Sequence, residues 1–385
     1  MLGFVNLALA LGQVGSLHGG FGTLTGQGNG QGGREHGQKA DQLPGYRSIS
    51  DPAARSHVAA VWGVDPDSLP GPGPSAFEML SELGNPGGVR CLLVAGSNPV
   101  VSAPAAAGVE RSLERLSFLA VADVVMSETA ALADVVLPVA QWAEETGTLT
   151  NLEGRLVMRQ AACRPPEGVR DELEVIAELA RLLGFDQGFG PDPEAVFSEL
   201  ATASAGGVAD YSGIDYAKIG SPTGVSWPCP APDHPGTPRL FGDRFPTPDG
   251  RARFFGVDHR PRFEDVDAEF PFVLTTGRVV AHYQSGAQTR RVAALAGACP
   301  EPFVEIHPVA ARHLGIADGS SVRLVTRRSA AVVAARVTES IRPDTVFVPF
   351  HWGGAGRANS LTDTALDPFA KMPSFKRCAV RLEPV

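Results

Sequence analysis

The sequence predicts an α/β protein in which a parallel sheet is followed by a β-barrel. Two continuous apolar runs, Cys91–Val100 and Phe118–Met126, flank a helical segment at Val109–Leu116. Strand, helix and strand in this order, with apolar residues throughout each strand, are typical of a parallel sheet that is buried on both faces. In the last part of the chain the pattern changes to six short β runs separated by turn signals, which favours a closed barrel.

The size and charge of the chain exclude several classes of protein. Its 385 residues carry a formal net charge of -9, and 43% of them are hydrophobic. This length suits two or three domains, and we place the division between residues 1–265 and 266–385. An acidic chain without basic runs is not expected to bind nucleic acid or anionic membranes. The apolar runs fall short of the ~18 residues of a membrane span, so none is predicted.

The spacing of the cysteines and the first residues of the chain indicate the cellular compartment of the protein. The five cysteines are far apart, and none belongs to a Cys-x-x-Cys pair. This spacing predicts neither a zinc site nor a four-cysteine iron–sulfur site. Free thiols are typical of a reducing compartment, so we expect a cytoplasmic protein. The apolar start, MLGFVNLALALG, has no Lys or Arg before Arg34, unlike the charged beginning of a signal peptide.

Helical periodicity and capping residues predict the elements of the first part. Asp51 with Pro52, and Ser75, are expected to begin helices, and Gly184 to end one. Helices are predicted over residues 3–12, 51–63, 75–83, 109–116, 171–184 and 193–205. Residues 64–74 are an extended connector, and residues 206–268 are a long connection with a β-hairpin at residues 245–254.

Two further stretches of the first part stand out. Ser127–Arg155, SETAALADVVLPVAQWAEETGTLTNLEGR, begins with a helix-like turn, continues into the apolar strand ADVVLPV, bends at Glu144 and Glu145 and ends in a second strand. Gly19–Gly37 is rich in glycine, which would let the backbone approach a ligand closely. A flexible loop is the alternative interpretation of this glycine-rich stretch.

The C-terminal part is predicted as a six-stranded barrel with one helix, Pro308–Leu314. The strand sequences are FPFVLTTG, FVEIHP, SVRLVTR, AAVVAARV, TVFVPF and CAVRLEP. Polar residues cluster at and after the end of the first strand: Thr276, Gly277, Arg278, His282 and Ser285. Glycine would let the backbone approach a diphosphate, and the Arg, His and Ser side chains would donate hydrogen bonds to it.

Four more polar residues lie at positions suited to ligand binding. Asn98 and Asp123 follow the two sheet strands, and parallel sheets bind ligands at the carboxyl ends of their strands. Each could instead be a turn former or a helix cap. Asn359 and Lys376 lie in the C-terminal part, where an Asx-turn and a solvated surface charge are the alternatives.

Together these segments resemble the molybdopterin oxidoreductases, a family that binds molybdenum through bis(molybdopterin guanine dinucleotide). The resemblance rests on ADVVLP with WAEETGTLTNLEGR, on NLALALG with GQGNGQGG, on TGRVVAHYQSG, and on NSLT with FK near the end. The ending GGRE of the glycine-rich stretch resembles the nitrate-reductase branch. The family implies an incomplete, doubly wound parallel sheet of the formate dehydrogenase and DMSO reductase type, followed by a six-stranded double-psi barrel.

The resemblance also implies which residues bind the cofactor. Asn98, Asp123 and Glu172 would contact the guanine dinucleotide, with Glu172 standing where relatives often have Asp. The pterin-binding turn would consist of Thr276, Gly277, Arg278, His282 and Ser285, while Asn359 and Lys376 would contact the cofactor from two later turns. We expect Arg278, Asn359 and Lys376 to converge on one face of the barrel, and Arg327 to be a surface residue outside the site. His351 and Trp352 are interpreted either as lining the pterin or substrate funnel or as a packed aromatic corner.

The chain lacks two segments with which members of this family begin, an iron–sulfur cysteine motif and the residue that binds molybdenum. We therefore expect the C-terminal portion of such a protein, with the 4Fe–4S cluster confined to the missing N-terminal half. No catalytic residue or metal ligand is predicted within it. The implied reaction reduces nitrate, a small anion, to nitrite by oxygen-atom transfer at molybdenum, with a ferredoxin or flavoprotein as electron donor. The alternatives are a formate dehydrogenase-like subunit and a non-catalytic module of a truncated or split enzyme, which would bind a partner carrying the missing half.

Overall fold

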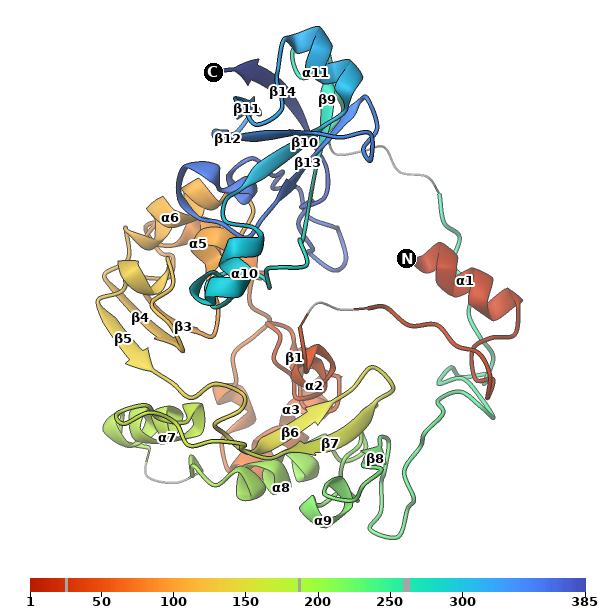
Figure 1. Cartoon of the computed structure of the whole chain (residues 1–385). Helices are drawn as coiled ribbons and strands as arrows, with labels where there is room; N and C mark the ends of the chain where they lie inside the picture. Colours follow the sequence, from red (N-terminus) through yellow and green to blue (C-terminus); the bar gives the residue numbers. More distant parts are fainter. Residues whose placement is uncertain (25–26, 186–187, 259–263) are drawn as a thin grey trace. The chain divides into compact units, whose positions relative to one another are not determined.

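The computed structural model describes residues 1–24, 27–185, 188–258 and 264–385, so that Thr25 and Gly26 of the glycine-rich stretch lie outside the described residues. The chain folds into two compact units, each built from two separate segments (Figure 1). Unit 1 comprises Met1–Gly73 and Ala140–Arg260, and unit 2 comprises Pro74–Val139 and Pro261–Val385. Residues 74–139 thus group with the barrel, whereas the sequence assigns them to the first part. The division at residue 265 stays a prediction.

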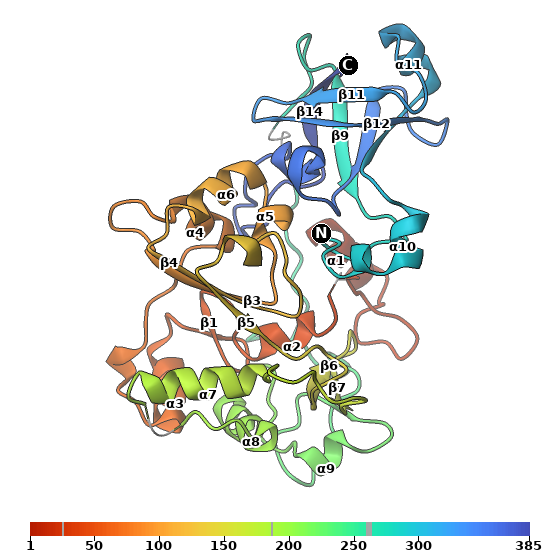
Figure 2. The ribbon, with the colours of Figure 1, turned by 60° about the vertical axis from the view of Figure 1, so that its left-hand side comes forward.

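Unit 2 contains the predicted parallel sheet. Its strands lie in the order β3, β4, β5 (Cys91–Ala95, Phe118–Asp123 and Val135–Pro138). Three helices accompany them: α4 (Ala76–Glu82), α5 (Pro99–Ser102) and α6 (Ala106–Leu113). Figures 1 and 2 show α5 and α6 on the same side of the strands, where Val94, Val109 and Leu119 belong to the shared core. Ser75 begins α4 with the reciprocal hydrogen bonds of a capping box, which confirms the predicted N-cap.

Part of the other face of this sheet is exposed, although Ala122 on that face is buried. The prediction that the strands are buried on both faces is wrong for β3. Val94 is the buried residue of β3, whereas Leu93 is 45% exposed. The register places Leu93 beside Ala120 of β4, and Ala120 beside Val135 of β5, which is 40% exposed. Because side chains alternate between the two faces of a sheet, a continuous apolar run does not reveal whether both faces are covered.

The C-terminal part of unit 2 is a closed six-stranded barrel, as predicted. Its strands are β9 (Phe272–Gly277), β10 (Phe303–Ile306), β11 (Ser321–Val325), β12 (Ala330–Val337), β13 (Thr345–Pro349) and β14 (Cys378–Pro384). They pair in the order β10-β12-β11-β14-β9-β13, with β10/β12 and β13/β9 parallel and the other pairs antiparallel. Inward-facing side chains such as Leu274, Val304, Leu324 and Val346 fill the interior.

Two helices accompany the barrel strands. Helix α11 (Pro308–Leu314) forms as predicted, while α10 (Ala293–Ala298) is a short helix that the sequence analysis does not predict. The double-psi connectivity of the barrel stays a prediction. None of the helices in the described ranges is both long enough and apolar enough to cross a membrane.

Unit 1 is built around an antiparallel sheet of β6 (Gly147–Thr150), β7 (Arg155–Arg159) and β8 (Val225–Ser226), with a separate pair β1 (Gln42–Leu43) and β2 (Arg47–Ser48). Its helices are α1 (Leu2–Ala10), α2 (Gly30–Glu35), α3 (Pro52–Trp62), α7 (Glu172–Leu182), α8 (Pro193–Ser204) and α9 (Tyr216–Ile219). Asp51 caps α3 by accepting the backbone N–H of Ala53, and Gly184, with φ +88°, follows the last turn of α7. Both predicted helix ends are confirmed.

The segment 206–268 is more than the surface connection that its Gly and Pro content predicts. Tyr211, Ile214, Ile219, Val225 and Trp227 are buried and pack into the core of unit 1. The prediction of a β-hairpin at residues 245–254 is wrong, because these residues form a turn without strands. The backbone N–H of Phe245 donates to the carbonyl of Gly250 across this turn. Gly and Pro content therefore does not exclude a segment from the core.

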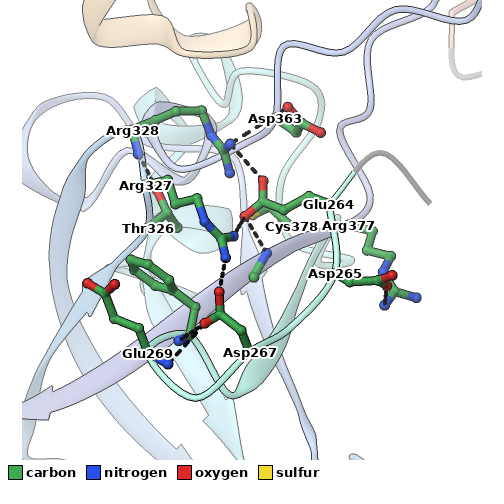
Figure 3. Close-up of polar contacts among 12 residues, drawn as sticks. Glu264, Asp265, Asp267, Glu269, Thr326, Arg327, Arg328, Asp363, Arg377 and Cys378 are labelled. Atoms are coloured by element: carbon green, nitrogen blue, oxygen red, sulfur yellow. Dashed lines mark hydrogen bonds and ion pairs between the residues drawn. The ribbon is translucent and has the colours of Figure 1, made fainter. Parts of the chain in front are cut away.

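An acidic strap, residues 264–269, leads into β9 and is fastened to the barrel by ion pairs (Figure 3). The side chain of Glu264 is 9% exposed, and its carboxylate lies 2.6 Å from Arg327 and 2.7 Å from Arg328. Arg328 also donates to the carbonyl of Leu361 at 3.3 Å. The strap is thereby connected to the segment that leads from β13 to β14.

Candidate functional site

Asn98 follows β3 and is held by the turn after β4. Its Oδ1 accepts hydrogen bonds from the backbone N–H of Thr129 at 3.2 Å and from the Thr129 hydroxyl at 2.8 Å. Its Nδ2 donates to the carboxylate of Glu128 at 2.7 Å, and the residue is 7% exposed. The amide is therefore fixed in one orientation, and one of its two N–H groups remains for a further acceptor.

Asp123 ends β4, the strand next to β3 in the sheet. Its Oδ1 accepts the backbone N–H of Val124 at 2.8 Å, a local bond that is typical of Asp in a turn. The side chain is partly exposed. Asn98 and Asp123 thus follow adjacent parallel strands at the same edge of the sheet, where ligands of such sheets bind.

Thr276 and Gly277 end β9 and shape the turn that follows. Thr276 donates its hydroxyl to the carbonyl of Phe375 at 2.7 Å, which ties β9 to the segment before β14. A Cβ on Gly277 would lie 2.6 Å from the ring of Phe347, so any other residue would displace that ring. These two predicted residues position the turn by packing and backbone contacts.

Arg278 and Lys376 lie together over the ring of Phe350. The guanidinium carbon of Arg278 is 5.7 Å from the ring centre, and Nζ of Lys376 is 5.1 Å from it. Lys376 donates to the carbonyl of Thr276 at 3.0 Å, and Arg278 donates to Oε1 of Gln284 at 3.3 Å. Burial, and then the charge of Arg278, lower the pKa of Lys376. Within the described ranges neither cation has a carboxylate partner, so the pair is suited to an anion.

His282 is a buried support of the same turn. Its Nε2 donates to the carbonyl of Cys299 at 2.7 Å, and its Nδ1 lies 3.1 Å from the hydroxyl of Thr289. Both ring nitrogens are therefore engaged within the protein. Ser285 is partly buried, and its hydroxyl has no hydrogen-bond partner among the residues that the structure describes. Of these two predicted residues, Ser285 is the one with a free donor.

His351 and Trp352 form a packed aromatic corner, one of the two interpretations that the sequence leaves open. His351 is fully buried; its Nε2 accepts the backbone N–H of Val279 at 3.0 Å and its Nδ1 donates to the carbonyl of Gln284 at 2.6 Å. Burial lowers the pKa of His351 to about 4, so the ring is neutral near pH 7. Trp352 is 6% exposed and meets the His282 ring edge-on at 5.1 Å.

Asn359 is turned toward helix α5. Its Nδ2 donates to the carbonyl of Val101 at 2.8 Å, and the neighbouring Arg357 donates to the carbonyl of Val100 at 2.8 Å. These bonds satisfy carbonyls at the end of α5 that have no partner within the helix. The expected approach of Arg278 and Lys376 is thus present, whereas the amide of Asn359 is occupied by the helix that begins next to Asn98.

Several buried polar atoms around the barrel turn lack a partner. Among the described residues these are Nε2 of Gln284, Nε of Arg290, Nε1 of Trp352 and Oδ1 of Asn359. Three of the four are hydrogen-bond donors. A buried donor without a partner is costly, so this surplus of donors indicates that the region is built for a ligand rich in acceptors.

Glu172, the tenth predicted residue, lies in unit 1 at the start of α7. Burial, and then the neighbouring Glu145 carboxylate, raise the pKa of Glu172 to about 7. Carboxylate oxygens of Glu145, Asp171 and Glu172 lie within 4.8 Å of one another. Asp171 caps α7 by accepting the backbone N–H of Leu173, and Glu145 lies 2.5 Å from Arg159, so two of the three have protein partners. The Glu172 carboxyl is itself hydrogen-bonded to Glu145, and this contact adds to the rise in the pKa of Glu172.

The glycine-rich stretch, so far as it is described, is attached to β6 through Thr150. Oδ1 of Asn29 accepts the backbone N–H of Thr150 at 2.9 Å, and Glu35 accepts the Thr150 hydroxyl at 2.8 Å. The Tyr211 hydroxyl also donates to Glu35, which is 1% exposed. Burial raises the pKa of Glu35, although these hydrogen bonds oppose the shift. Residues 29–35 are therefore anchored, which argues against a flexible loop there, whereas residues 20–24 are exposed.

Comparison with known protein families shows to which family this chain belongs. Residues 2–182 match the family described as "Molybdopterin oxidoreductase", and residues 272–379 match the "Molydopterin dinucleotide binding domain". The chain belongs to the molybdopterin oxidoreductase family. The closed barrel that carries Arg278 and Lys376 corresponds to the dinucleotide-binding domain of this family.

Known members of the family differ in what they reduce or oxidise. The chain is 47% identical over 386 residues to the assimilatory nitrate reductase catalytic subunit of Bacillus subtilis, covering 100% of this chain and 54% of that protein. It is 38% identical over 379 residues to the F420-dependent formate dehydrogenase subunit alpha of Methanocaldococcus jannaschii, covering 98% and 54%. The nitrate reductase of Synechocystis is 39% identical, covering 99% and 55%. The chain spans about half the length of these relatives.

A solved structure confirms the fold of this molybdopterin oxidoreductase family member. Acetylene hydratase from Pelobacter acetylenicus superposes with a TM-score of 0.60 at 18% sequence identity, covering 86% of this chain and 50% of that one. At this identity the likeness concerns the fold alone. The predicted α/β class with a C-terminal barrel is confirmed.

Sequence reasoning missed several residues that build the site. Glu128 and Arg290 join the sheet end to the barrel turn through an ion pair of 2.6 Å, and Phe350 supports both cations. Gln284 joins Arg278 to His351 by using its side chain and its carbonyl. A signal was present for two of them, since Glu128 lies in SETAALADVVLP and Arg290 follows the H-x-x-S-G turn.

Proposed function

We propose that this chain binds molybdopterin guanine dinucleotide as the C-terminal portion of a molybdenum-dependent nitrate reductase. The observation that carries the proposal is the barrel turn, where Arg278 and Lys376 lie together without a carboxylate partner in the described ranges. Beside them Gln284 and Arg290 have buried donors without a partner. A cofactor with diphosphate and pterin groups supplies the acceptors that such a region needs.

The residues of the chain would share the binding as follows. Arg278 and Lys376 supply positive charge for phosphate oxygens, and the free donor of Ser285 adds a hydrogen bond. Asn98 and Asp123 offer polar groups at the sheet end for the guanine nucleoside. Thr276, Gly277 and His282 hold the turn in shape through the contacts described above. Asn359 supports the site through α5. Glu172 stays a cofactor-binding residue that the family resemblance alone predicts.

When bound, the molybdenum centre supplies the oxygen-atom transfer that converts nitrate to nitrite, because the cofactor carries the difficult chemistry in such enzymes. The chain itself binds and orients the cofactor and keeps water from its buried groups. We infer that electrons come from a 4Fe–4S cluster outside this chain, fed by a ferredoxin or a flavoprotein. All five cysteines are free, which is consistent with a cytoplasmic location.

We further infer that another polypeptide segment, supplied by a longer protein or a partner subunit, completes the active enzyme. The chain spans about half of its relatives, and the partly exposed face of the β3-β4-β5 sheet exposes Leu93, Phe118 and Val135 by 40% or more. An exposed apolar sheet face of this kind favours association with further protein. A non-catalytic binding module is the corresponding alternative for the chain alone.

A second candidate function is formate oxidation. It is favoured by 38% identity to the formate dehydrogenase subunit of Methanocaldococcus jannaschii across nearly the whole chain. The 47% identity to the nitrate reductase subunit of Bacillus subtilis ranks nitrate first. Two assays of the completed enzyme distinguish these activities. Nitrate reduction is measured with reduced viologen as electron donor, and formate oxidation is measured with an oxidised dye as electron acceptor.

The binding proposal is tested by removing the guanidinium of Arg278. Arg278 is exposed in the chain alone, and a phosphate bound over it would bury the charge pair, whose loss then costs about 2–5 kcal/mol of binding. Arg278→Ala should therefore weaken the binding of GDP and of pyrophosphate, measured by titration calorimetry at low ionic strength, by at least tenfold. Arg312→Ala, an exposed arginine on α11, is the control and should bind as the wild-type chain does. Equal affinities for Arg278→Ala and the control would rule out this turn as the phosphate site.

A further inference from the structure

Glu128 is a meeting point of three segments of unit 2. It follows β4; its Oε2 accepts from Nδ2 of Asn98 at 2.7 Å, and its Oε1 accepts from Nη2 of Arg290 at 2.6 Å. Gly353, after β13, packs so closely that a Cβ there would lie 3.0 Å from Cγ of Glu128. Burial opposes ionisation of Glu128, but the hydrogen bonds from Arg290 and Asn98 outweigh it and lower its pKa. The carboxylate is therefore charged and bound on both oxygens near pH 7.

The two partners of Glu128 each keep a donor that is not used within the described structure. Asn98 has one N–H left, because Thr129 donates to its oxygen and Glu128 accepts one hydrogen of its amide. Arg290 has a buried Nε without a partner. Glu128 helps to orient the Asn98 amide, because a carboxylate can accept from the amide nitrogen but not from the amide oxygen, and it holds Arg290 through Nη2.

We propose that Glu128 is a positioning residue that presents Asn98 and Arg290 together to one guanine nucleotide. The proposal rests on the proposed function and goes beyond it by naming a residue that holds the sheet end and the barrel turn in one binding geometry. Without the carboxylate, the amide of Asn98 loses its partner at Nδ2 and is held by Thr129 alone, and the guanidinium of Arg290 loses its ion-pair partner. Both ends of the nucleotide then lose their oriented donors.

Arg291 provides a matched control because it makes the same mechanical connection without touching Asn98. Its Nη2 donates to the carbonyl of Met126 at 2.6 Å, and its Nη1 donates to the carbonyl of Ala287. It thus fastens the same segment after β4 to the same barrel turn. Arg291→Ala should lower thermal stability but leave the orientation of the Asn98 amide and the Arg290 guanidinium unchanged.

The test measures the affinity of the purified full chain for GDP and for ADP by titration calorimetry. The wild-type chain should prefer GDP. Glu128→Gln keeps the size of the side chain but leaves one partner facing an N–H donor, so GDP should bind about tenfold to a hundredfold more weakly, the effect of one lost charge-assisted hydrogen bond. Its preference over ADP should shrink as well. Arg291→Ala should keep both properties within about threefold.

Thr129 gives a second pair of variants in case Glu128→Gln folds poorly. Thr129→Val removes the hydroxyl that donates to Asn98 at 2.8 Å and should reduce the preference for GDP, whereas Thr129→Ser keeps the hydroxyl and should retain it. Unchanged GDP binding in both Glu128→Gln and Thr129→Val overturns the role of Glu128 alone. An equal loss in Arg291→Ala also overturns it, because a general structural role then explains the effect. A wild-type chain that does not prefer GDP contradicts the proposed function itself, and the role of Glu128 with it.

Discussion

Removing the carboxylate of Glu264 should destabilise unit 2 far more than removing an exposed carboxylate of the same acidic strap. Glu264 lies 2.6 Å from Arg327 and 2.7 Å from Arg328, and it accepts the backbone N–H of Ala379 at 3.1 Å (Figure 3). Glu264→Gln keeps the size of the side chain but replaces one acceptor oxygen by a donor. Because the amide is neutral, both ion pairs are lost; its oxygen can still accept a hydrogen bond from one arginine, while its N–H group faces the other.

The magnitude follows from how buried each partner is. Removing one partner of a buried ion pair costs about 3–5 kcal/mol, whereas an exposed pair contributes about 1 kcal/mol or less. Arg328 is 20% exposed and keeps Asp363 at 3.7 Å; Arg327 is 36% exposed and keeps Asp267. These remaining partners offset part of the loss, so we expect the free energy of unfolding of unit 2 to fall by about 2–3 kcal/mol.

The assay is native-state hydrogen exchange of the backbone amides of β11 and β14 in increasing urea, which reports the opening of the barrel by itself. The matched control is Glu269→Gln, whose side chain is 67% exposed and pairs with Arg381 at 2.9 Å; its loss should be below about 0.5 kcal/mol. Equal losses in the two variants would refute the reasoning. The strap would then be held by its backbone contacts rather than by the buried carboxylate.

Two further predictions concern carboxylates of unit 1 whose pKa values are raised. Burial raises the pKa of Glu35 above 4.5, so its protonated form favours folding; the stability it contributes is fully present below pH 4.5 and is lost as pH rises through the folded-state pKa. Urea unfolding of unit 1 between pH 4 and 8 should show this loss, and a Glu35→Gln variant with the same slope as the wild-type chain would contradict it. Burial and the charge of Glu145 raise the pKa of Glu172 to about 7, so Glu145→Gln should move the infrared carboxyl titration of Glu172 toward lower pH; an unchanged midpoint would exclude the coupling.

The barrel was predictable because its strands alternate apolar and polar residues in short runs, which is a local property. In β11, for example, Val322 and Leu324 face the core while Ser321 and Arg323 are exposed. The parallel sheet was also predictable from local apolar runs. Whether helices cover each face of the sheet was not predictable from these runs. Leu93 and Val135 lie in apolar runs, yet whether a helix covers them depends on residues elsewhere in the chain or outside it.

The sequence indicated which residues to consider for the site better than it indicated which partners those residues contact. Asn98 and Asp123 follow the strands as expected, but the sequence does not show that Asn359 donates to helix α5 instead of remaining open. Arg327 is exposed, as expected of a surface residue, but the sequence does not show that it pairs with Glu264 and lies over the ring of Phe270 at 4.7 Å. Such long-range partners depend on the tertiary fold, because they join residues more than fifty positions apart.

The folding of residues 74–139 with the barrel has a consequence for binding. Nine of the ten predicted site residues lie in unit 2, namely Asn98, Asp123, Thr276, Gly277, Arg278, His282, Ser285, Asn359 and Lys376; the tenth, Glu172, lies in unit 1. The bonds from Glu128 to Asn98 and to Arg290, and from Arg357 and Asn359 to α5, hold the sheet end and the barrel turn together within this single unit. The geometry between the proposed nucleoside and phosphate contacts is therefore set inside unit 2. In our proposal, selection of the nucleotide and retention of its phosphates depend on one compact unit, which is why a change at Glu128 or Arg278 should act on binding without any change in unit 1.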